Sequence, residues 1–136
     1  MQDKLGIFLL NWRINAVLPH ISGDLLDVGC GTNILCARYR QKKPQARAVG
    51  VDVYPWEGVD TVVSNSGSLP FENASFDTVS CIAALNHIPE RDAFIMEAAR
   101  MLRPEGALIL TMIPPGISRI WHFVRSPWDA DQHERG

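Results

Sequence analysis

Charge of one sign, paired cysteines and long apolar runs are all scarce in this sequence. Its 13 basic and 15 acidic residues leave a formal charge of −2. Because no block of Lys or Arg stands out, we expect neither nucleic acid nor an anionic membrane as a partner. No stretch is long and apolar enough to span a bilayer. The apolar residues 7–10 are soon followed by Arg13, without a small-residue cleavage site, which argues against a signal peptide.

The three cysteines exclude further classes of protein. Cys30, Cys36 and Cys81 are odd in number, lack the spacing of a metal site, and each lie in an apolar segment. We therefore expect reduced thiols, no metal and a cytoplasmic protein.

What is present fits one domain. The 136 residues are 46% hydrophobic, enough to bury a single core. We expect one domain over 1–136, with an N-terminal helix over 1–20, a core over 22–114 and a tail over 117–136. The helix should cover the sheet, and a lid over a cofactor site is the alternative role. Its predicted apolar face consists of Leu5, Phe8, Leu9, Trp12 and Val17.

Strand and helix patterns alternate along the core. Strands are expected at 24–28, 46–52, 60–63, 76–82 and 107–113, and helices at 33–43 and 89–103. This alternation predicts an α/β fold with a Rossmann-like, doubly wound and mainly parallel sheet. The link over 53–59 is short for a parallel crossover, and Pro55, Trp56 and Gly58 argue against a helix in it. Residues 117–124 fit one short helix.

The glycine-rich turn over 27–33 is the main functional signal. Its first strand ends in an acid, and Gly29 and Gly31 follow, one residue apart, before a helix. Such a turn exposes backbone N–H groups and a helix N-terminus at one edge of the sheet, where a nucleoside-containing cofactor can bind. A tight turn without a ligand is the structural alternative.

The dinucleotide NAD is one candidate cofactor for this turn. The dinucleotide fingerprint requires a third glycine, but Ile34 occupies that position, and Asp27 is foreign to the pattern. Both residues disfavour NAD.

Five segments occur in the order, and at roughly the spacing, of a known family. The chain resembles the class I S-adenosylmethionine-dependent methyltransferases, in the branch that acts on small molecules and lipids. The matching segments are Leu25-Leu26-Asp27-Val28-Gly29-Cys30-Gly31-Thr32, Gly50-Val51-Asp52, Ser68-Leu69-Pro70-Phe71 with Ser75-Phe76-Asp77, Leu85-Asn86-His87-Ile88-Pro89, and Leu102-Arg103-Pro104-Glu105-Gly106.

The resemblance implies a role for each matched position. The methionine portion of S-adenosylmethionine would face Asp27, the backbone of Gly29, Cys30 and Gly31, and Ala83 and Ala84. Asp52 would accept hydrogen bonds from both ribose hydroxyls, and Val53, Asn65 and Ser66 would contact adenine. In the strand order 3-2-1-4-5 the ligand crevice lies between strands one and four, where Asp27 and Asp52 would supply negative charge beside a sulfonium cation.

Methyl transfer from a sulfonium is an in-line displacement that requires a general base only when the acceptor must lose a proton. His87 is the candidate base, and a structural role in capping the next helix is its alternative. The leading function is methyl transfer to a small-molecule or lipid-like acceptor. A non-catalytic cofactor-binding or assembly partner with the same fold is the second possibility.

The sequence also departs from the family. Asn33 replaces a third glycine, Asn65 replaces a common acid, and the helix between strands two and three is missing. Asn33 can adopt the left-handed conformation and cap the helix, or narrow the pocket. The reduced C-terminal part predicts a bare apolar edge on strand five. We expect Trp121, Phe123 and Trp128 to cover it, a homodimer through this edge or the tail, or a shortened protein.

Overall fold

The computed structural model describes residues 4–82, 88–112 and 119–124. Four helical segments lie in this part: α1 (Lys4–Val17), the short 3-10 helix η1 (Leu18–His20), α2 (Ile34–Lys42) and α3 (Arg91–Met101). The strands are β1 (Leu25–Val28), β2 (Ala48–Asp52), β3 (Thr61–Val62), β4 (Phe76–Ile82), β5 (Leu102–Met112) and β6 (Arg119–Val124). None of the helices described is long and apolar enough to cross a membrane.

The sheet has the order β3-β2-β1-β4-β5-β6, and its first five strands are parallel. The predicted order 3-2-1-4-5 is therefore confirmed. β1 occupies the centre, where Asp27 is paired in register with Gly50 of β2 and with Ser80 of β4. The carboxyl ends of these strands meet at one edge, where ligands bind in doubly wound sheets.

The prediction of a helix over 117–124 is wrong. Residues Arg119–Val124 form β6, which pairs antiparallel with β5 from Met112↔Arg119 to Ala107↔Val124. Ile, Trp, Phe and Val favour strands, and the unpaired backbone edge of β5 gives such a strand its hydrogen-bond partners. The edge of β5 is thus paired within the chain, and it does not offer the route to a homodimer that we expected. Trp128 lies outside the described residues.

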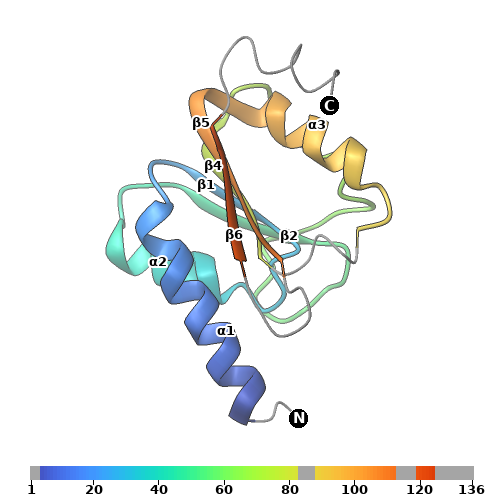
Figure 1. The fold of residues 1–136 in the computed structure, drawn as a ribbon. Coiled ribbons are helices and arrows are strands. Elements are labelled where there is room, and N and C mark those ends of the chain that lie inside the picture. Colours follow the sequence, from blue (N-terminus) through green and yellow to red (C-terminus); the bar gives the residue numbers. More distant parts are fainter. Residues whose placement is uncertain (1–3, 83–87, 113–118, 125–136) are drawn as a thin grey trace.

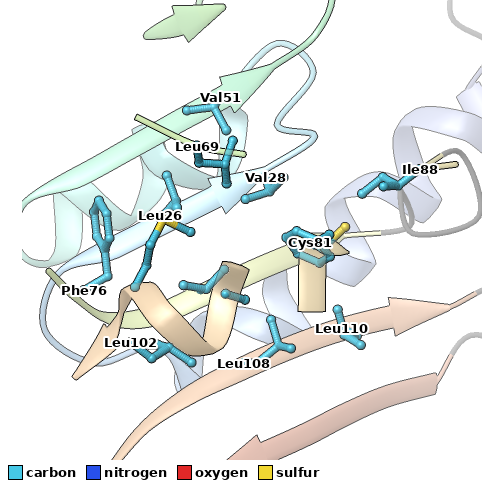
Figure 2. Packing of buried hydrophobic residues seen from close by; sticks show 14 of the residues in the cluster. Leu26, Val28, Val51, Leu69, Phe76, Cys81, Ile88, Leu102, Leu108 and Leu110 are labelled. Atoms are coloured by element: carbon cyan, nitrogen blue, oxygen red, sulfur yellow. The ribbon is translucent and has the colours of Figure 1, made fainter. Parts of the chain in front are cut away.

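Helices cover both faces of the sheet, with α1 and α2 on one side and α3 on the other (Figure 1). The α3 side is filled by a large cluster of buried residues, which β1, β2, β4 and β5 supply together with the helix (Figure 2). Its centre includes Leu26, Val79, Phe94 and Met101, all fully buried. On the other side, Ile14 and Val17 of α1 pack with Leu25 and with Tyr39 of α2.

The predicted apolar face of α1 is only partly correct. Val17 is buried, but Leu5, Phe8, Leu9 and Trp12 are exposed. The helix packs against the domain through Leu10, Ile14 and Val17 instead. Apolar residues at helical spacing occur on two opposite sides of α1, so their periodicity alone did not identify the side that is buried.

Candidate functional site

A pocket of about 260 Å³ lies at the carboxyl end of β1. Four residues predicted from the glycine-rich turn line it: Asp27, Gly29, Cys30 and Gly31. Thr32, Ile34 and Leu35 continue the wall into α2, and Ile82 adds the end of β4. Leu10 and Ile14 of α1 close another side, so this helix both covers the sheet and borders the site.

The backbone of the turn is fixed by the neighbouring strand. Gly29 and Gly31 have φ values of 72° and 57°, the left-handed region in which glycine is unstrained. The N–H groups of Gly29 and Cys30 donate to the carbonyl of Val51, at 2.9 and 3.0 Å. A Cβ atom at Gly31 would meet nothing within 4 Å. The turn therefore leaves open space directly above its backbone, which a bound molecule can fill.

Asp27 is a buried carboxylate at the pocket wall. The Ser80 hydroxyl donates to its Oδ1 at 2.8 Å, the one side-chain hydrogen bond that this acid receives from the residues described. Burial, opposed by the Ser80 bond and reinforced by the charge of Asp52, raises the pKa of Asp27 to about 7. An incoming cation would stabilise the ionised form, so Asp27 is suited to bind positive charge. Ser80 was not predicted, because a serine inside an apolar strand gives no separate signal.

Asp52 lies at the end of β2, beside the turn. The N–H of Gly31 donates to its Oδ2 at 2.9 Å, and the N–H of Tyr54 donates to its Oδ1 at 3.1 Å. These bonds fix the carboxylate against the glycine turn, and each oxygen retains a lone pair for a further donor. This is the place predicted for it, at the sheet edge that also holds Asp27.

Asn33 adopts the left-handed conformation that we expected, with φ 67° and ψ 31°. Its side chain makes no capping hydrogen bond, however, and it does not line the pocket. Nδ2 instead donates to the Gly58 carbonyl at 3.0 Å and to Asp60 Oδ2 at 2.8 Å. The capping prediction is wrong because acceptors in the link after β2 lie within reach of this amide.

The link between β2 and β3, residues 53–60, contains no helix, as predicted. Asp60 fixes its end by accepting hydrogen bonds from Gly50 N, Asn33 Nδ2 and Arg40 Nη2. Burial opposes ionisation of Asp60, but these three bonds outweigh it and the pKa is lowered.

Gly58 brings this link against the glycine turn. A Cβ atom there would stand 2.6 Å from the carbonyl oxygen of Thr32, so only glycine permits the approach. The close contact places Trp56 at the pocket, where the centroid of its ring lies 4.5 Å from the centroid of the Tyr54 ring. Trp56 and Asp60 were missed, because a link without regular structure carries no periodic pattern.

The other predicted residues lie apart from this pocket or outside the described part. Val53 is exposed after β2, the Asn65 side chain accepts from Gly67 N in its own turn, and Ser66 N donates to Glu90. Ala83, Ala84 and His87 lie outside the described residues. Their predicted roles stay predictions.

Among the residues that the structure describes, the pocket lining has one charged side chain, Asp27. A dinucleotide pyrophosphate would place negative charge beside this acid, and the described part of the wall supplies no cation. A sulfonium or ammonium group would find a counter-charge. The fold and this site together define a Rossmann-like domain with a pocket suited to a cationic, nucleoside-containing ligand.

A family model for a methyltransferase domain matches residues 26–110, and the chain belongs to this family. The malonyl-(acyl-carrier protein) O-methyltransferase of Hahella chejuensis is 34% identical, over 74% of this chain and 42% of its own length. The 27-O-demethylrifamycin SV methyltransferase of Amycolatopsis mediterranei is 35% identical, over 72% and 42%. The ubiquinone biosynthesis O-methyltransferase of Xanthomonas oryzae is 32% identical, over 74% and 47%. The chain thus spans less than half the length of these relatives.

Solved structures share the fold. An S-adenosylmethionine-dependent methyltransferase from Thermotoga maritima superposes with a TM-score of 0.65 at 20% identity, over 76% of this chain and 51% of its own. The predicted family and Rossmann-like fold are confirmed, and the family implies S-adenosylmethionine as the cofactor.

Proposed function

We propose that the protein transfers a methyl group from S-adenosylmethionine to a small-molecule or lipid-like acceptor. The observation that carries the proposal is the open glycine turn beside Asp27, the one charged side chain in the described part of the pocket wall. The names of the relatives support the acceptor class, since they refer to malonyl-(acyl-carrier protein), to 27-O-demethylrifamycin SV and to ubiquinone biosynthesis.

In this proposal Asp27 and the turn over Gly29, Cys30 and Gly31 hold the methionine portion. Asp52 holds the ribose hydroxyls, because a single carboxylate can accept from both. Val53, Asn65 and Ser66 remain the proposed contacts to adenine. Ala83 and Ala84 remain the proposed neighbours of the methionine portion.

When bound, the cofactor supplies a methyl group already activated by its positive sulfur. The protein then has to align the acceptor and exclude water. Leu10, Ile14, Trp56 and Ile82 give the pocket an apolar wall that suits both tasks. His87 remains the proposed base for acceptors that must lose a proton.

A reducing, cytoplasmic location is part of the proposal. Cys30, Cys36 and Cys81 form no disulfide with one another. Burial, with nearby carboxylates, raises the pKa of Cys30 to about 12, and burial likewise raises that of Cys36. Such thiols stay protonated and unreactive.

Calorimetric titration with S-adenosylmethionine, S-adenosylhomocysteine and NAD tests the proposal. We expect both sulfur compounds to bind and NAD not to bind. Asp52→Ala should weaken their binding by roughly 1–3 kcal/mol, the range for hydrogen bonds to a charged group. The matched control is Asp92→Ala, an exposed acid on α3, which should leave binding unchanged.

Two results would contradict parts of this assignment. Absence of binding by either sulfur compound would overturn the cofactor assignment. Binding without methyl transfer to thioester, polyketide or quinone acceptors would favour the non-catalytic alternative.

A further inference from the structure

Helix α1 carries two opposite apolar faces, and the domain covers only one of them. Leu10, Ile14 and Val17 are spaced to share one side, which packs on the core and lines the pocket. Leu5, Phe8, Leu9 and Trp12 share the opposite side, which we call the outer stripe. Figure 1 shows the N-terminal half of α1 projecting beyond the sheet.

The outer stripe is large, apolar and exposed. Leu5 is 65% exposed, Phe8 63% and Trp12 49%. These are large apolar side chains grouped on one surface rather than scattered singly, and such a patch marks a site of interaction.

Cations border the outer stripe on both sides. Lys4 precedes Phe8 by four residues and Arg13 follows Leu9 by four, so one lies along each edge of the stripe. Arg38 of α2, which donates to Asn11 and Asn15, adds a third cation along the edge of Lys4. α1 itself contains no acidic residue, and Asp3, next to it in the sequence, lies outside the described residues.

Helices that lie in a membrane interface place aromatic and aliphatic side chains beside Lys and Arg, and the outer stripe with its flanking cations shares this arrangement. Apolar side chains enter the acyl boundary, while Lys and Arg reach anionic headgroups. A second copy of the chain fits this face less well. It would bring the same cations to the contact and no acid of α1 to pair with them.

We propose that the outer stripe of α1 docks the protein on an anionic lipid surface. The net charge of −2 argued against such a partner, but the cations lie beside the larger exposed apolar surface of the helix, while only Ile7 is exposed among the large apolar residues on the opposite side. The opposite face of the same helix lines the pocket, so docking would bring the site close to the membrane. The proposal does not depend on methyl transfer.

Flotation of the full chain with vesicles tests this docking. One set of vesicles contains phosphatidylcholine alone, and the other contains phosphatidylcholine with phosphatidylglycerol. We expect binding to the second set, weakened by added salt. Lys4→Gln and Arg13→Gln should each weaken this binding about fivefold, corresponding to ~1 kcal/mol per cation. The double variant Phe8→Ser with Trp12→Ser should abolish it.

The control is Met96→Ser, which changes a side chain of α3 that is 70% exposed. It should float like the unaltered chain. Thermal unfolding and titration with S-adenosylhomocysteine verify that each variant is folded and keeps its pocket, so loss of docking is distinguished from loss of the cofactor site. Equal binding to both vesicle sets, or unchanged binding by the double variant, would overturn the proposal. So would a dimer that the double variant dissociates, without vesicle binding, because the stripe would then be an interface between copies.

Discussion

The two faces of the sheet differ in how completely their described residues are packed. We call the face covered by α3 the closed face, and the face covered by α1 and α2 the open face. On the α3 face, Phe94, Ala98 and Met101 are fully buried. On the same helix, Arg100 donates to the carbonyls of Leu69 and Phe71, and Glu97 accepts from Leu69 N. The α1 and α2 face instead contains the pocket, the buried acid Asp27 and a helix with one uncovered side.

This difference separates stability from binding. The closed face gains apolar burial and satisfied hydrogen bonds from its described residues. The open face retains a buried carboxylate whose ionisation opposes folding, and groups with perturbed pKa values cluster at functional sites. Substitutions on the two faces should therefore affect different measurements.

The largest expected effect is on the closed face. Phe94→Ala removes a fully buried ring from the cluster under α3, and we expect a loss of about 3–5 kcal/mol in the free energy of unfolding. Met96→Ala, on the exposed side of the same helix, should change it by less than ~0.5 kcal/mol. Urea denaturation measures both. Similar losses for the two variants would show that the cluster is not the main source of stability.

Asp27→Asn should change stability and binding in opposite directions. The pKa of Asp27 is about 7 in the folded protein, against an ordinary value of 3.8 for this side chain. Ionisation thus opposes folding, fully above pH 7 and not at all below pH ~4. We expect the variant to be more stable by about 2–4 kcal/mol at pH 8, with a gain that disappears as the pH falls towards 4.

The same variant should bind S-adenosylmethionine at least ~10-fold more weakly at pH 8, because the cation loses its counter-charge. The unaltered protein should bind more tightly as the pH rises through 7, and Asp27→Asn should lose this dependence. Denaturation and calorimetry across pH measure both effects. A variant that is destabilised at pH 8, or that keeps the pH dependence of binding, would show that Asp27 is not the titrating group of the pocket.

Substitutions at Asn33 measure how much its side-chain hydrogen bonds and its left-handed backbone contribute to the stability of the protein. Asn33→Gly keeps the left-handed backbone but removes the bonds to Gly58 and Asp60, so we expect a loss of roughly 1–3 kcal/mol. Asn33→Ala should lose about 1 kcal/mol more, because alanine is strained at φ 67°. Denaturation of the pair separates the two contributions. Equal stability of the two variants would argue against backbone strain in Asn33→Ala. An unchanged free energy of unfolding in Asn33→Gly would show that the side-chain bonds of Asn33 do not stabilise the protein.

The sequence predicted most of the closed face and only part of the open one. The strand order and the positions of Asp27 and Asp52 were predictable, because apolar strands that end in acids and glycines meet at one sheet edge. The paired edge of β5 was not, since residues 117–124 were interpreted as a short helix, and the partner that makes 119–124 a strand is the distant edge of β5. Trp56 reaches the pocket through the contact of Gly58 with Thr32, a tertiary approach that spacing along the chain does not reveal.

The smallest effects should distinguish the two sides of α1. Leu10 lines the pocket, while Leu9 lies on the outer stripe, so the two neighbours form a matched pair. Leu10→Ala should weaken binding of an apolar acceptor or of S-adenosylhomocysteine roughly threefold, by removing part of the apolar wall, and leave vesicle flotation unchanged. Leu9→Ala should do the reverse. Because both changes delete the same atoms from adjacent positions of one helix, a shared loss of helix propensity cancels in the comparison. Identical effects of the two variants on both assays would show that α1 does not divide its faces between pocket and membrane.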